Sequence, residues 1–140
     1  MKIIAVDLGA ARTGLAVCDE NEILASPAGV INERDMCRLA ETVCAAAKKH
    51  GAERVVVGLP RNMDGSEGDS AKNARAFAEK IKEVSGLPVF MQDERGTTVT
   101  AHGYLNDTNT RGRKRKAIID AVAATVILQD YLARRKNGNA

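Results

Sequence analysis

The chain has few cysteine, proline and aromatic residues. Its 140 residues include three cysteines, three prolines, two phenylalanines, two tyrosines and no tryptophan. The cysteines are Cys18, Cys37 and Cys44, and no two of them form a C-x-x-C pair. An odd number of cysteines suits reduced thiols better than a disulfide framework. We therefore expect all three to serve as small apolar core residues.

Long apolar runs are also missing. No stretch approaches about 18 consecutive apolar residues, and the start lacks the basic and then apolar pattern of a secretory signal. We expect a cytoplasmic protein with no membrane partner. The composition, 44% hydrophobic and 28% charged, excludes a disordered polar chain. The length predicts one domain, residues 1–140, with one core.

The net charge of +3 is unevenly distributed. One basic cluster combines Arg111 with the run 113–116, and a second covers 134–136, whereas the remainder of the chain has more acidic than basic residues. A basic run is often only a solvated loop. Beside an acidic catalytic site, it would instead suit a polyanionic substrate.

Hydrophobic patterning predicts an α/β fold with the order βββαβαβ followed by two helices. Expected strands are 2–8, 13–18, 23–31, 54–59 and 87–91, the third of them an edge or late-starting strand because it contains Pro27. Expected helices are 35–50, one capped by Ser66 and ended by Gly86, a short one from Thr97 or Thr98 to Leu105, and one over about 116–135. A polar, basic loop is expected from Asn106 to about Arg115.

Two acidic residues occupy apolar surroundings. Asp7 lies in a strand that is apolar on both faces, so its carboxylate needs a cation or a hydrogen-bonding turn at 9–13. Asp120 lies in the nearly all-apolar helical segment 117–128, where it either points at a site on the sheet or forms a surface pair with Lys116.

A third acidic position follows a buried strand. Asp93 and Glu94 come directly after it, at the sheet edge from which α/β folds present functional side chains. Together with Asp7 and Asp120 they suggest carboxylates converging on a divalent metal, because Mg²⁺ prefers oxygen ligands. Such ions activate water and stabilise the leaving oxygen in phosphodiester cleavage.

Four ordered motifs carry a resemblance to a known family. They are Val6-Asp7-Leu8-Gly9 through Gly14-Leu15-Ala16, the segment Val57 to Ser66, Asp93-Glu94-Arg95 with Thr97-Thr98, and Lys116 to Asp120 with Ala123-Ala124 and Ile127-Leu128-Gln129. Over almost the whole chain the sequence resembles the YqgF family, whose fold is similar to RuvC-type Holliday-junction resolvases and RNase H. The resemblance implies a single-domain RNase H-like nuclease, its mixed sheet flanked by helices, that trims the 5′ end of precursor 16S ribosomal RNA in ribosome biogenesis.

The resemblance also implies roles for individual residues. Asp7, Glu94 and Asp120 would bind Mg²⁺ or Mn²⁺, with Asp93 as the neighbouring candidate for the second acid. Arg12 and Arg95 match arginines of the family motifs and would contact phosphate, because a guanidinium binds it bidentately. Independently of the resemblance, the charge pattern makes Arg113, Lys114, Arg115 and Lys116 the candidate residues that bind along the nucleic acid. Ala11, Gly96 and Thr100 depart from residues frequent in the family, and none of the three is an expected metal ligand.

Alternatives remain open at this stage. The same chemistry could cut junction DNA, which normally calls for a symmetric dimer. The fold could also serve a non-catalytic RNA-binding adaptor of the ribosome, whose binding would be mostly electrostatic because few aromatics are available for stacking. Asp7-Leu8-Gly9 followed by Gly14 also resembles the first phosphate loop of actin-like ATPases, but those enzymes use two such domains.

Overall fold

The computed structural model describes residues 1–9, 11–62, 64–94 and 112–138, and the side chains of 112–121 lie outside that description. Its framework is one five-stranded sheet in the order β3-β2-β1-β4-β5. The strands are β1 (Ile3–Asp7), β2 (Thr13–Cys18), β3 (Ala25–Ile31), β4 (Arg54–Leu59) and β5 (Val89–Asp93). The first three strands are antiparallel neighbours, whereas β1, β4 and β5 run parallel. This is the mixed sheet that the sequence predicts.

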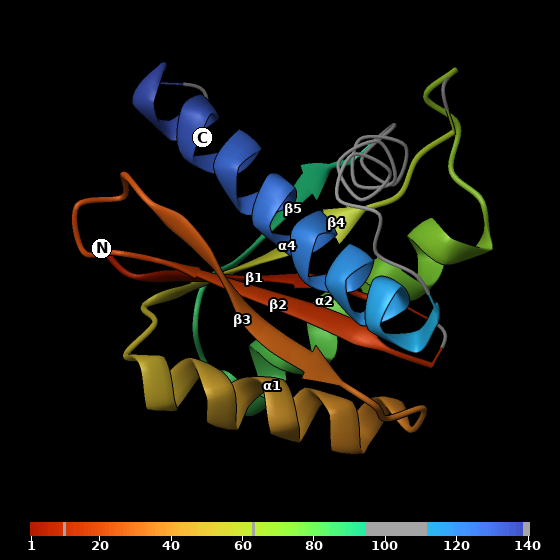
Figure 1. Cartoon of the computed structure of the whole chain (residues 1–140). Coiled ribbons are helices and arrows are strands. Elements are labelled where there is room, and N and C mark those ends of the chain that lie inside the picture. The colour runs from red at the N-terminus through yellow and green to blue at the C-terminus, as the bar shows by residue number, and fades with distance from the viewer. Residues whose placement is uncertain (10, 63, 95–111, 139–140) are drawn as a thin grey trace.

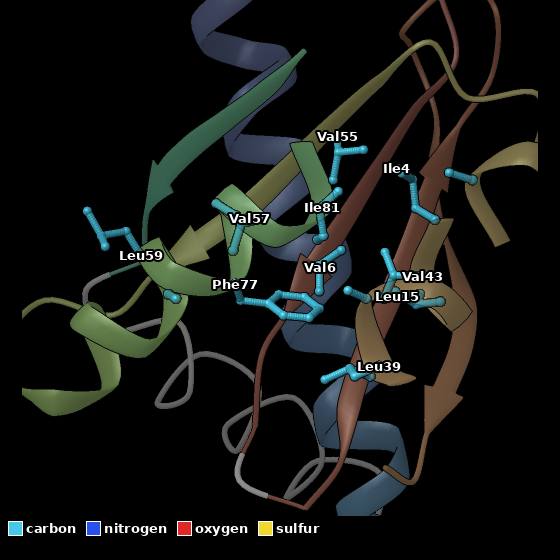
Figure 2. Close-up of a cluster of buried hydrophobic side chains, with 14 of the residues drawn as sticks. Ile4, Val6, Leu15, Leu39, Val43, Val55, Val57, Leu59, Phe77 and Ile81 are labelled. Atoms are coloured by element: carbon cyan, nitrogen blue, oxygen red, sulfur yellow. The ribbon is translucent and has the colours of Figure 1, made fainter. Parts of the chain in front are cut away.

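Helices cover both faces of the sheet (Figure 1). Helices α1 (Met36–His50) and α2 (Asp69–Ser85) pack on one face, and α4 (Gly112–Lys136) crosses the other. The core between the sheet and α1–α2 is aliphatic apart from Phe77 (Figure 2). A second cluster under α4 contains Ala124, Ile127, Leu128 and Tyr131. Among the described residues no helix is long and apolar enough to cross a membrane.

Local signals explain most element boundaries. Asp35 caps α1 by accepting hydrogen bonds from the backbone N–H groups of Cys37 and Arg38, and Gly51 ends the helix in the left-handed region at φ 70°. The strand containing Pro27 is an edge strand, as predicted.

Several predicted boundaries are wrong. Ser66 does not cap α2, because the N-cap of that helix is Gly68. The hydroxyl and backbone N–H of Ser66 instead donate to the Asp64 carboxylate in a turn. The strand predicted to end at 91 continues to Asp93, because pairing with β4 extends to Leu59. The last helix begins at Gly112, so the basic run 113–116 is helical and not a loop; lysine and arginine are good helix formers.

The cysteine prediction holds only in part. All three thiols are free, with Cys18 buried and Cys44 half-buried, but Cys37 is exposed on α1. The short helix predicted from Thr97 or Thr98 to Leu105 lies outside the described residues.

Candidate active site

Three parallel strands end at one edge of the sheet. Asp7 is the last residue of β1, Leu59 the last of β4 and Asp93 the last of β5. The β4–β5 pairing continues one residue further, because the backbone N–H of Glu94 donates to the carbonyl of Leu59 at 3.1 Å. The carboxyl ends of parallel strands are where open α/β sheets place their functional groups.

Strand alternation sends Asp7 and Gly58 to the face that α4 covers. Ala5 and Val56, each two residues earlier on its strand, belong to the cluster under α4. Side chains two residues apart on a strand share a face of the sheet. The positions Asp7 on β1 and Gly58 on β4 therefore face α4.

Alternation separates the two adjacent acids after β5. Met91 packs against the core on the α1–α2 face, so Asp93, two residues on, projects toward that face. Glu94 projects the other way, and its carboxylate lies over Gly58. The structure thus brings Glu94, and not Asp93, to the side of the sheet that holds Asp7.

Gly58 provides the space in which the acids meet. A Cβ atom built at Gly58 would lie 2.8 Å from Oε2 and 2.9 Å from Cδ of Glu94, and 2.5 Å from Cδ1 of Ile127. Strand β4 lies between β1 and β5, so any side chain at this position would stand between the two acids. Because glycine has none, a carboxylate that follows β5 can cross β4 toward Asp7.

The two carboxylates perturb one another. Burial, the negative charge of Asp7 and a hydrogen bond with the Asp7 side chain together raise the pKa of Glu94 from 4.5 to about 8, and the charge of Asp93 adds to the effect. At neutral pH the pair therefore shares a proton when no cation is present. A bound divalent cation would remove this repulsion, and a set of carboxylate oxygens is what Mg²⁺ prefers. The residues present fit such an ion.

Asp93 has a different partner. Its Oδ2 lies 3.8 Å from Nη1 of Arg61, and Nη2 of the same guanidinium lies 3.4 Å from Oε2 of Glu67. Glu67 in turn accepts two hydrogen bonds from Arg75, at 2.8 and 2.9 Å. Asp93 thus ties the end of β5 to the loop between β4 and α2.

The other predicted site residues are placed only in part. Asp120 lies within α4, but its side chain is outside the description, as are those of 113–116 and all of Arg95. Among the side chains that are described, no three acidic, histidine or cysteine groups gather closely enough to hold a metal. Arg12 is half-buried in the turn after β1, where a Cβ at Gly9 would lie 2.1 Å from the Arg12 carbonyl oxygen.

The sequence pattern does not single out Gly58 or Arg61, which lie within the motif segment Val57 to Ser66. A signal for Gly58 was available, because a glycine that interrupts the run Val55-Val56-Val57 indicates close approach of another group. No comparable signal marks Arg61, since Asp93, the partner that connects it to the site, is distant in the sequence.

The fold is that of RuvC-type, RNase H-like nucleases. RuvC of Thermus thermophilus superposes with a TM-score of 0.59 at 15% identity, covering 98% of this chain and 97% of that one. The same protein in complex with a Holliday junction substrate gives 0.60 at 16% identity, covering 100% and 98%. The fowlpox virus Holliday junction resolvase gives 0.56 at 13% identity, covering 95% and 99%.

Sequence comparison identifies the family. Residues 1–134 match the RuvX family, described as Holliday junction resolvase. Relatives from Caldanaerobacter subterraneus (38% identity over 98% of this chain and 99% of the relative) and Anaeromyxobacter (41%, 96% and 98%) are both named "Putative pre-16S rRNA nuclease". The chain belongs to the RuvX family of nucleases, which confirms the resemblance to YqgF proteins.

Proposed function

We propose that this chain is a divalent-metal-dependent nuclease of the cytoplasm that trims the 5′ end of precursor 16S ribosomal RNA during ribosome biogenesis. The observation that carries the proposal is the pair Asp7 and Glu94, held together over Gly58 at the carboxyl edge of the sheet. The names of the relatives support the choice of RNA as substrate.

Asp7, Glu94 and Asp120 would hold the ion, Mg²⁺ or Mn²⁺. Support for Asp120 comes from the direction of α4. Ile127 lies at Gly58, and Tyr131 accepts a hydrogen bond from Arg54 near the start of β4, so α4 runs from the carboxyl edge of the sheet toward the opposite edge. Asp120 precedes Ile127 by seven residues, nearly two turns of α4, and this spacing supports Asp120 as the third ligand.

The chemistry divides simply between ion and protein. When bound, the ion would supply an activated water and neutralise charge on the cleaved phosphodiester. Asp7 and Glu94 would bind the ion as carboxylates, so Glu94 gives up the proton that it holds in the metal-free protein. Asp93 would act by holding the loop through Arg61.

Basic residues near the site would bind the substrate backbone. Arg12 directly precedes β2, Arg95 follows Glu94 in the sequence, and Arg113, Lys114, Arg115 and Lys116 belong to the first turns of α4. Lysine and arginine bind phosphate without reading sequence, so this contribution should fall as salt rises.

Cleavage of Holliday junction DNA is the second candidate, favoured by the description of the family. The test compares wild type and Asp7→Asn on a labelled precursor 16S 5′ leader and on a four-way DNA junction, each with Mg²⁺, Mn²⁺ or EDTA. Trimming of the RNA that needs metal and is lost in the variant supports the proposal. If only the junction is cut, the substrate is DNA and the proposal of an RNA substrate is wrong. Binding of RNA or ribosomes without any cutting would indicate an adaptor.

A further inference from the structure

A strip of mainly aromatic and basic side chains from β4, β5 and the C-terminal half of α4 lies away from the acidic pair. We call it the aromatic–basic strip; its members are Arg54, Phe90, Gln92, Tyr131 and Arg134. The guanidinium carbon of Arg54 lies 4.2 Å from the centroid of the Phe90 ring, and Nη1 of Arg54 donates to the hydroxyl of Tyr131 at 2.7 Å. Nη1 of Arg134 donates to Oε1 of Gln92 at 2.6 Å.

Two features of this strip are unexpected for a purely structural cluster. Phe90 is 37% exposed, although Tyr131, whose ring centroid is 6.1 Å away, is only 1% exposed. Arg54 has no carboxylate within ion-pair distance in the described part of the chain, and its Nε is buried without a hydrogen-bond partner there. A half-buried cation without a counter-ion attracts an anion.

The strip is continuous with the acidic site. Phe90 and Gln92 alternate with Val89 and Met91, which pack in the α1–α2 core, so they share with Glu94 the face of β5 that looks toward α4. Glu94 is four positions after Phe90, a distance of about 13 Å along an extended strand. A nucleic-acid strand spans that distance in about four stacked nucleotides, or fewer when extended. Strand β5 is also an edge strand of the sheet, and among the described residues no further strand pairs with it.

We propose that the aromatic–basic strip is a second nucleic-acid subsite, in which a base stacks on Phe90 while Arg54 and Arg134 bind phosphates of a single strand that runs along β5 from the cleavage site. Arg54 lies over one face of the Phe90 ring, and the tilted ring of Tyr131 packs beside it, 6.1 Å away between centroids. The exposed remainder of the ring takes the base. This inference rests on the proposed function, since it assumes that the acidic pair cuts a nucleic-acid strand.

A fluorescent probe tests the stacking directly. The chain contains no tryptophan, so Phe90→Trp introduces a single indole into the strip. Titration with a single-stranded RNA of roughly ten nucleotides, within the usual size of single-strand sites, in EDTA to prevent cleavage, should quench its emission. Val84→Trp on α2, at a position 54% exposed on the other face, is the matched control and should not respond.

Two further variants measure the contribution to binding. Phe90→Ala should weaken RNA affinity about 5- to 100-fold, the range for loss of one stacked base. Arg54→Gln should lower the slope of log affinity against log salt by about 0.7, the value for one phosphate contact to a single strand. Lys49→Gln, on α1, should leave that slope unchanged.

The outcomes separate this inference from the proposed function. If wild type cuts RNA but Phe90→Trp emission does not change at saturating RNA, or if Phe90→Ala and Arg54→Gln bind RNA as wild type does, the subsite is refuted and the nuclease stands. If the indole is quenched but wild type cuts no nucleic acid with metal, the strip binds RNA and the proposed activity fails. In the expected case, Phe90→Ala raises KM without lowering kcat, and only for substrates long enough to reach the strip.

Discussion

Substitution of Gly58 by alanine should inactivate the protein more than it destabilises it. The added methyl carbon would lie 2.5 Å from Cδ1 of Ile127 and 2.8 Å from Oε2 of Glu94. Non-bonded carbon atoms normally approach to about 3.5–4.0 Å, so α4 or the Ile127 side chain must move by about 1 Å. The Glu94 carboxylate must also retreat from its place over β4.

The magnitudes follow from these displacements. Overpacking a tight core costs about 1–3 kcal/mol of unfolding free energy, whereas misplacing a catalytic group by about 1 Å can cost roughly 100-fold in rate. We expect Gly58→Ala to remain folded with kcat reduced about 100-fold. The measurements are urea unfolding and single-turnover cleavage of the 5′ leader. Gly68→Ala is the matched control, because a Cβ there meets nothing within 4 Å.

A second substitution separates the two clashes. Ile127→Val removes the Cδ1 atom that lies 2.5 Å from the new methyl, but leaves Glu94 untouched. In the Ile127→Val background, Gly58→Ala should lower the free energy of unfolding much less than it does in wild type. The kcat of the double variant should nevertheless stay low. A folded Gly58→Ala protein with wild-type kcat would refute the reasoning, because Glu94 would then not act from the space above β4.

Three further predictions concern stability. Because the folded-state pKa of Glu94 is raised to about 8, the metal-free protein loses stability as pH rises from 4.5 to about 8. Glu94→Gln should therefore become more stable than wild type above pH 8 in chemical unfolding, and equal stability at all pH values would contradict the coupling. Gly9→Ala places a Cβ 2.1 Å from the Arg12 carbonyl oxygen, so it should lower the melting temperature and the activity together; an unchanged melting curve would show that the turn can open. Asp35→Ala removes the N-cap of α1, so the variant should melt several degrees lower than wild type at pH 7, with kcat unchanged. Hydrogen bonds from Arg38 and Cys37 lower the pKa of Asp35. The stabilisation by this cap is therefore present above pH 3.8 and declines as pH falls below it.

Much of the fold could be predicted because its signals are local. The strand Thr13–Cys18 and the helix that Asp35 caps and Gly51 ends were predicted from alternation, helical period and end residues. Ser66 misled the prediction because it satisfies the sequence pattern of a cap, but Asp64 competes for its hydroxyl and its N–H. The same short polar side chains form helix N-caps and turns, so the residue type alone does not distinguish the two.

The site was less accessible to sequence reasoning. The choice between Asp93 and Glu94 depends on where β5 ends, since one residue more or less reverses the face to which each acid points. The role of Gly58 depends on the order of strands in the sheet, which puts β4 between two strands that are far apart in the sequence. The end of β5 and the order of the strands cannot be read from any short stretch of residues. The presence of an acid in a buried strand can.

Calorimetric titration with Mn²⁺ at pH 7, in two buffers of different ionisation enthalpy, tests the central claim most directly. If Asp7 and Glu94 hold a divalent ion over Gly58, wild type and Asp93→Asn should bind Mn²⁺ with release of about one proton, since Glu94 is protonated in the metal-free protein. Asp7→Asn should bind far more weakly, and Glu94→Gln should bind weakly and release no proton. Unchanged Mn²⁺ affinity in both of these variants would contradict the assignment of the acidic pair as the metal site.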